Sequence, residues 1–118
     1  MITVRVDLGS RSYNIYIGSG ILEGLGSRVR EITSGGKALL VSNRKVFDLY
    51  GEIVSETLAA GGFEVVPCEM GDGEENKDLA TLEKLWDAAF NHNMDRRCPV
   101  VALGGGVVGD TAGLAAAT

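Results

Sequence analysis

The sequence predicts an α/β fold in which a mostly parallel, Rossmann-like sheet carries helices on both faces and follows an N-terminal β-hairpin. Two segments of alternating apolar and polar residues flank a glycine-containing turn near the N-terminus. Three short apolar runs then alternate with segments whose apolar residues recur at helical spacing. Strands separated by helices are typical of a three-layer parallel sheet with right-handed crossovers. Glycine, at 17 of 118 residues, stands mainly at the ends of these elements.

The N-terminal elements are a hairpin, a helix and a buried strand. The hairpin strands lie within residues 2–8 and 13–17. Ser19 is expected to cap a helix whose apolar face comprises Ile21, Leu22, Leu25, Val29 and Ile32. After a break at residues 34–36, residues 37–42 form a continuous apolar run, as expected for a strand buried on both faces.

The remaining elements alternate between helix and strand. A second helix ends at Gly61 and has an apolar face of Val46, Leu49, Tyr50, Ile53, Val54 and Leu58. Residues 63–69 predict a strand, in which Pro67 marks the end or an edge position. The third helix has the apolar positions Leu79, Leu82, Leu85, Trp86, Ala89 and Phe90, and Trp86 and Phe90 are expected in the core. Residues 99–103 predict the last strand, before a glycine-rich turn and a helix of small residues.

Composition excludes several classes of protein. The net charge is −5 and no basic run is present, which argues against nucleic acid or an anionic membrane as a partner. No segment reaches the ~20 apolar residues that span a bilayer. Cys68 and Cys98 are expected as free thiols in a reducing compartment, and the single His92 makes a metal site within the chain improbable. The apolar, uncapped ending at residues 111–118 favours a chain cut from a longer protein.

The first candidate site is the pattern G-x-G-x-x-G at residues 104–109, which follows a strand and opens a helix. Backbone N–H groups at such a turn can face a pyrophosphate, and the missing Cβ atoms allow close approach. A turn that packs tightly on a neighbouring element explains the glycines equally well. Asp110 is either aimed into the same cleft or placed in the first helical turn by the helix dipole.

Two further candidates end other strands at the same edge of the predicted sheet. Residues 72–77 offer a Glu for ribose hydroxyls and Lys77 for phosphate, or simply the acidic first turn of a helix. Asn43 either faces the ligand or caps a helix.

These motifs resemble 3-dehydroquinate synthase. The resemblance is carried by residues 72–77, the helix at 81–87, the turn at 95–96 and the run at 101–113, and it extends to residues 16–18 and 39–43. It covers essentially the whole chain. The two long motifs, in this order, are specific to the sugar-phosphate cyclase group, whereas the glycine run with its Asp alone also fits polyol dehydrogenases related to glycerol dehydrogenase.

The resemblance implies a cytoplasmic lyase of the shikimate pathway, in aromatic amino acid and chorismate biosynthesis. Such enzymes use NAD and a divalent metal, zinc or cobalt, to convert 3-deoxy-D-arabino-heptulosonate 7-phosphate into 3-dehydroquinate and phosphate, and they are commonly homodimers. Their metal and substrate ligands lie in a second domain, so residues 1–118 are expected to be an incomplete N-terminal NAD-binding domain that is inactive alone. Another sugar-phosphate cyclase, a polyol dehydrogenase and a stand-alone nucleotide-binding module are the alternatives.

The resemblance also assigns site residues. Glu74 and Lys77 fall at the adenosine side of NAD, and Asp110 lies nearest the chemistry and is the expected catalytic residue. The full set of implied NAD contacts is Asn43, Asp72, Gly73, Glu74, Glu75, Asn76, Lys77, Gly105, Gly106, Val107, Val108, Gly109 and Asp110. Lys45 replaces an Asn found in many members, so that contact is not expected here.

Overall fold

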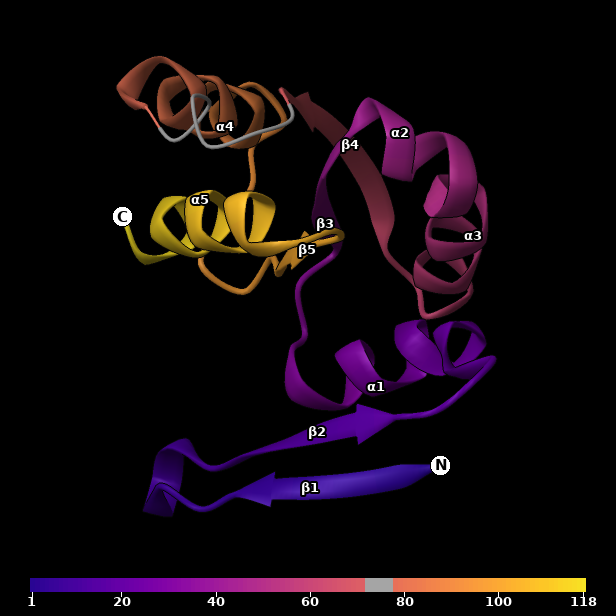
Figure 1. Cartoon of the computed structure of the whole chain (residues 1–118). Helices are drawn as coiled ribbons and strands as arrows, with labels where there is room; N and C mark the ends of the chain where they lie inside the picture. Colours follow the sequence, from indigo (N-terminus) through magenta and orange to yellow (C-terminus); the bar gives the residue numbers. More distant parts are fainter. Residues whose placement is uncertain (72–77) are drawn as a thin grey trace.

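The computed structural model describes residues 1–71 and 78–118 and confirms the α/β architecture. A parallel sheet of strand order β4-β3-β5 is formed by Lys37–Asn43 (β3), Glu64–Met70 (β4) and Val100–Ala102 (β5). A separate antiparallel hairpin pairs Ile2–Val6 (β1) with Tyr13–Ile17 (β2) around a 3-10 turn, Gly9–Arg11 (η1). Figure 1 shows the hairpin beside α1, apart from the parallel sheet.

Helices cover both faces of the parallel sheet. One face carries Leu25–Ile32 (α1) and Glu52–Ala60 (α3), while the other carries Leu79–Asn91 (α4) and Gly106–Ala117 (α5). Shorter helical segments precede α1 and α3: Ile21–Gly24 (η2), Arg44–Val46 (α2) and Phe47–Gly51 (η3). The three-layer arrangement predicted by the alternation of strands and helices is therefore confirmed.

The central strand β3 supplies both halves of the core. Leu39 and Val41 face α4 and α5, where they pack with Leu85 and Val108. Ala38 and Leu40 face the other way and join a cluster that includes Leu58. Alternate residues of a strand point to opposite faces, so a strand covered on both sides is apolar throughout, as the continuous run predicted. The edge position predicted for Pro67 is also found, since β4 pairs only with β3 among the described strands.

The first predicted helix is shorter and differently capped. Gly20, with φ of +69°, precedes η2 in place of the predicted Ser19 cap, and a regular α-helix begins only at Leu25. Leu25 and Val29 pack on the core as expected, whereas Ile32 is 83% exposed at the last residue of α1.

A π-helical segment changes the face of the second predicted helix. Segment η3 has a wider turn than an α-helix, and the apolar face is rotated so that Phe47 packs inward while Leu49, Tyr50 and Ile53 are exposed. Val54 and Leu58 remain fully buried as predicted. The wider turn brings the Phe47 ring close to residue 51. Glycine leaves room for it, since a Cβ there would lie 3.0 Å from Cδ1 of Phe47.

Close backbone contact joins α1 to α3. The N–H of Gly26 donates to Oγ1 of Thr57 at 3.1 Å, and that hydroxyl donates to the carbonyl oxygen of Glu23 at 2.7 Å. A Cβ added at Gly26 would lie 1.7 Å from the carbonyl oxygen of Thr57. Glycine is unfavourable inside a helix, but at position 26 it is what lets the two helices approach.

The described cysteines are free thiols, as predicted. Cys68 lies in the core cluster beneath α4 and α5, and burial raises the pKa of its thiol, an effect that nearby Lys84 partly offsets. We therefore expect this thiol to react slowly with alkylating agents. Among the described residues, none of the helices combines the length and apolar character needed to cross a membrane.

Candidate functional site

The candidate site lies where the three parallel strands end. In the register of the sheet, Asn43 at the end of β3 is opposite Met70 at the end of β4. On the other side of β3, the N–H of Leu103 donates to the carbonyl oxygen of Val41 at 2.9 Å. The carboxyl ends of β4, β3 and β5 thus share one edge, which is where ligands bind in open parallel sheets.

Ser42 fixes the start of the glycine-rich turn. Its hydroxyl, fully buried, donates to the carbonyl oxygen of Leu103 at 2.5 Å. This contact ties the residue before Gly104 to the central strand, next to Asn43. Sequence reasoning placed Ser42 at this edge but did not predict this hydrogen bond. The feature that could have indicated it is a hydroxyl residue near the end of an otherwise apolar strand.

Gly104 is required by the fold. Its φ of +145° lies in the region that L side chains rarely adopt, and a Cβ would lie 3.2 Å from Cγ2 of Val108. At this position the packing explanation for the glycine is correct.

Packing does not explain the glycines that follow. A Cβ added at Gly105, Gly106 or Gly109 meets nothing within 4 Å in the described part of the chain, and none of the three has a positive φ. The backbone is left open just where α5 begins. The N-cap, Gly105, has no side chain to accept from the first amides of α5, which have no acceptor within the helix itself. This geometry suits an anionic ligand that approaches the backbone closely.

Asp110 lies one turn into α5, beyond the first turn in which the helix dipole was expected to favour it. The first intrahelical bond, from the N–H of Gly109 to the carbonyl oxygen of Gly105, is 3.0 Å long and sets this register. Asp110 is exposed and borders a cleft of about 340 Å³ between α4 and α5, which is lined by Asp78, Leu79, Leu82, Asp110, Thr111 and Leu114. The start of α4 and the second turn of α5 therefore face each other across this cleft.

Asn43 takes the capping role that was its alternative explanation. Its Oδ1 accepts from the N–H of Val46 at 2.9 Å, and its side chain is largely buried. One oxygen of the amide is thereby committed to holding α2 in place. Its contact with NAD remains a prediction.

Residues 72–77, which include Glu74 and Lys77, lie outside the described residues. The chain on either side is described: β4 ends at Met70, opposite Asn43, and α4 is capped by Asp78. Asp78 therefore supplies a carboxylate at the N-terminus of α4. The signal for it was an Asp directly before a periodic apolar segment.

The Asp78 cap predicts a stability that depends on pH. Its carboxylate accepts from the N–H of Thr81 at 2.8 Å, and this bond lowers the pKa of Asp78 below the usual value for Asp. The stabilisation is therefore present above the unfolded-state pKa and is lost as pH falls through the lower folded-state value. We expect Asp78→Asn, which retains a capping oxygen, to show a shallower loss of melting temperature on acidification, and Asp78→Ala to be less stable at neutral pH. Thermal melts of the three proteins between pH 7 and pH 2 test this, and parallel curves for Asp78→Asn and the parent protein would contradict it.

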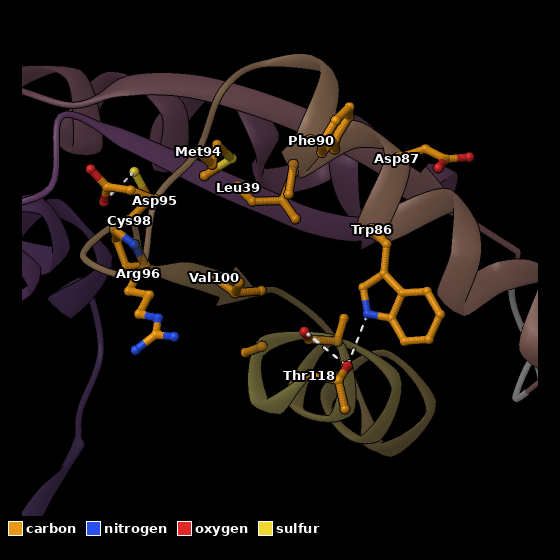
Figure 2. Close-up of a pocket in the computed structure, with 14 residues that line it drawn as sticks. Leu39, Trp86, Asp87, Phe90, Met94, Asp95, Arg96, Cys98, Val100 and Thr118 are labelled. Atoms are coloured by element: carbon orange, nitrogen blue, oxygen red, sulfur yellow. Dashed lines mark hydrogen bonds between the residues drawn. The ribbon is translucent and has the colours of Figure 1, made fainter.

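A second hollow, larger than the cleft beside Asp110, lies elsewhere. A groove of about 1110 Å³ runs between α4 and α5 at the amino ends of the strands, with Leu39 and Val100 at its base and Trp86, Phe90 and Thr118 along it (Figure 2). Phe90, expected in the core, is 83% exposed at this groove, and Trp86 is half-buried with its Nε1 donating to Oγ1 of Thr118 at 2.9 Å. The groove is on the edge of the sheet opposite the glycine-rich turn.

Comparisons with known proteins agree with this geometry. A family model described as 3-dehydroquinate synthase N-terminal matches residues 67–118. The 3-dehydroquinate synthases of Pelotomaculum thermopropionicum and Desulforamulus reducens are 57% and 49% identical over 100% and 98% of this chain. The chain spans about a third of their length, 32% in each case.

Solved structures share the fold. A 2-deoxy-scyllo-inosose synthase complexed with carbaglucose-6-phosphate, NAD⁺ and Co²⁺ matches with a TM-score of 0.86 and 28% identity, over 99% of this chain and 32% of that one. A 2-epi-5-epi-valiolone synthase from Streptomyces hygroscopicus with NAD⁺ and Zn²⁺ bound matches with a TM-score of 0.73 and 30% identity, over 95% of this chain and 31% of that one.

The sheet and its glycine-rich turn are thus similar to the corresponding regions of sugar-phosphate cyclases. The sequence identity to the 3-dehydroquinate synthases, 57% and 49%, is higher than the 28% and 30% identity to these two structures. This chain is similar to the N-terminal part of 3-dehydroquinate synthases, as the resemblance predicted.

Proposed function

We propose that this chain is the nucleotide-binding part of a 3-dehydroquinate synthase, a phosphate-eliminating lyase. The whole enzyme would convert 3-deoxy-D-arabino-heptulosonate 7-phosphate into 3-dehydroquinate and phosphate in the cytoplasm. The observation that supports this is the open backbone at Gly105, Gly106 and Gly109, at an edge where three parallel strands end. The related 2-deoxy-scyllo-inosose synthase and 2-epi-5-epi-valiolone synthase structures contain NAD⁺.

The described residues fit a dinucleotide at this edge. The amides at the start of α5 would hold the pyrophosphate, because no side chain of the turn stands between them and a ligand. Asp110 would lie beside the nicotinamide end, and Asn43 would lie near the adenosine end on the other side of the turn. Glu74 and Lys77, together with Asp72, Gly73, Glu75 and Asn76, are proposed for the ribose and phosphate of the adenosine half.

When bound, NAD would supply a reversible hydride transfer that oxidises a hydroxyl of the sugar to a ketone and later reduces that ketone. The task of this chain is to hold the dinucleotide in one orientation against that substrate. Across residues 1–71 and 78–118, no three His, Cys, Asp or Glu side chains gather as metal ligands. The divalent metal, zinc or cobalt, proposed for the whole enzyme would be held by residues outside this chain.

The sugar-phosphate substrate and the homodimer expected from the family are part of the same proposal. Carbaglucose-6-phosphate in the related 2-deoxy-scyllo-inosose synthase supports a sugar phosphate as the substrate class. Another sugar-phosphate cyclase remains the second candidate, because those structures share the fold at 28–30% identity. The 57% and 49% identities to curated 3-dehydroquinate synthases favour the first.

Calorimetric titration of the protein with NAD⁺ tests the proposal. We expect saturable binding that ADP-ribose competes away, since the proposed pyrophosphate and adenosine contacts lie in this chain. Asp110→Asn should lower the affinity for NAD⁺ and leave the affinity for ADP-ribose unchanged, because the proposed position of Asp110 is at the nicotinamide end. Absence of NAD⁺ binding by the protein would refute the proposed function.

A further inference from the structure

The strand order places the end of β3 beside the glycine-rich turn. Strand β5 leads into that turn, and β3 is its neighbour in the order β4-β3-β5. Adjacent strands lie about 4.8 Å apart, and the Ser42 hydroxyl joins the end of β3 to the carbonyl oxygen of Leu103. In open α/β sheets that bind dinucleotides, the strand next to the glycine-rich turn carries the residue that recognises the 2′ position of the adenosine ribose.

The chemistry of that residue distinguishes two kinds of cofactor site. A carboxylate there accepts from the 2′-hydroxyl of NAD and repels a 2′-phosphate, whereas cationic side chains neutralise the 2′-phosphate of NADP. In this chain β3 ends at Asn43, and Arg44 and Lys45 follow directly. These three residues include two cations and no carboxylate.

Asn43 offers a donor to a ligand at this position. Its Oδ1 accepts from the N–H of Val46 at 2.9 Å and so holds the start of α2. The other polar group of the side chain is the Nδ2 amide, which can only donate. A phosphate oxygen accepts such a bond, so Asn43 does not exclude a 2′-phosphate as a carboxylate would.

Arg44 and Lys45 are both exposed and weakly engaged. Nε of Arg44 lies 3.8 Å from Oδ1 of Asp48, and its Nη1 lies 3.7 Å from Oε2 of Glu69, with the Arg44 side chain 74% exposed. Exposed ion pairs of this length contribute little. None of the ion pairs between described residues involves Lys45. A dianionic phosphate would therefore gain Lys45 and displace only weak contacts of Arg44.

We propose that the nucleotide site accepts the 2′-phosphate of NADP as well as the 2′-hydroxyl of NAD, with Lys45 as the main specificity-determining residue and Arg44 as the second. The inference rests on the nucleotide site proposed above and assigns its selectivity at the adenosine ribose. The contacts would come from the two cationic side chains, not from the backbone amides of the short segment α2. Because they are ionic, added salt should weaken NADP⁺ more than NAD⁺.

Glu74, proposed above for the ribose, is the competing determinant. A carboxylate against the 2′ position would repel a 2′-phosphate, and the site would then exclude NADP. Glu74 follows β4 in the sequence, and β4 is one strand farther from the glycine-rich turn than β3 is. The strand order therefore favours Lys45 for the 2′ position and leaves the 3′-hydroxyl to Glu74.

Calorimetric titration with two matched pairs of ligands tests the proposal: NADP⁺ with NAD⁺, and 2′-phospho-ADP-ribose with ADP-ribose. We expect the dissociation constants within each pair to agree within about tenfold. Lys45→Ala should lower the affinity for both 2′-phosphorylated ligands about tenfold or more, because a charge-assisted contact is lost, and should leave NAD⁺ binding within about threefold of the parent protein.

Arg96→Ala is the matched control. Arg96 is exposed and belongs to the other pair of adjacent cations in the sequence, but it precedes β5 and so lies at the amino edge of the same sheet. This control should bind all four ligands as the parent protein does. Asn43→Asp provides the converse change, since aspartate keeps the cap on Val46 and adds a carboxylate at the ribose. It should lower the affinity for NADP⁺ about tenfold or more relative to NAD⁺.

Two results would overturn the inference while the nucleotide site itself stands. One is an affinity for NADP⁺ more than about tenfold below that for NAD⁺. The other is an affinity for NADP⁺ that Lys45→Ala and Arg44→Ala leave as high as Arg96→Ala does. If the protein binds neither NAD⁺ nor NADP⁺, the proposed function fails and this inference fails with it.

Discussion

Gly26→Ala is expected to destabilise the protein by about 3 kcal/mol or more. The new Cβ would lie 1.7 Å from the carbonyl oxygen of Thr57 and 2.5 Å from its carbonyl carbon, both of which are backbone atoms that cannot rotate away. Relief requires α1 and α3 to separate along their contact. That movement breaks the hydrogen bond from Gly26 to Thr57 and opens the cluster around Leu58 to water.

Urea denaturation of the parent protein and the variant measures this effect. Gly113→Ala is the control: it lies inside α5, and its Cβ would meet nothing within 4 Å. Because alanine favours a helix more than glycine does, this control should be as stable as the parent protein or up to about 1 kcal/mol more stable. A Gly26→Ala variant within about 0.5 kcal/mol of the parent protein would mean that the two helices separate at little cost.

Gly106→Ala is expected to lower the affinity for NAD⁺ by at least about tenfold while leaving the fold intact. The added Cβ meets no described atom, so the free energy of unfolding should change by less than about 1 kcal/mol. If the pyrophosphate lies against the backbone at the start of α5, however, the same methyl group occupies the space of the ligand and moves it off the amides.

Paired NAD⁺ titrations and denaturation curves distinguish these two effects. Gly36→Ala is the matched control, because its Cβ also meets nothing within 4 Å but it lies before β3, at the amino end of the strand. This control should bind NAD⁺ as the parent protein does. Unchanged affinity in Gly106→Ala would show that the open backbone at this turn does not contact the dinucleotide.

Periodicity predicted the layers but not how every helix is oriented. The alternation of apolar runs and helical segments was sufficient for the parallel sheet, because β3 must be covered on both faces to bury Leu39 and Leu40. The same periodicity misplaced Leu49 and Tyr50, since a rule with 3.6 residues per turn assumes a regular helix and η3 is π-helical. Phe90 fits the apolar face of α4 by spacing, but the helix end overhangs a groove there.

The candidate site could likewise be predicted only in part from the sequence. That strand ends converge follows from a parallel sheet, so the common edge of Asn43 and the glycine-rich turn could be predicted from the order of elements. The sequence could not predict which glycines the fold itself requires, because that depends on the packing around each one. A Cβ at Gly104 would contact Val108, whereas a Cβ at Gly106 would meet nothing within 4 Å in the described structure. The capping bond of Asn43 and the second-turn position of Asp110 likewise depend on where α2 and α5 begin.

The two-sided core has a consequence for assembly during synthesis. The cluster on one side, built around Ala38, Leu40 and Leu58, is made mainly of residues up to Phe63 and can therefore close while the nascent chain is still short. The opposite cluster needs Leu85, Val108 and Ala112, so the other side of β3 and β4 stays uncovered until α5 leaves the ribosome. During that interval Leu39, Val41 and Val66 belong to an exposed apolar sheet face, which is the kind of surface that a chaperone binds.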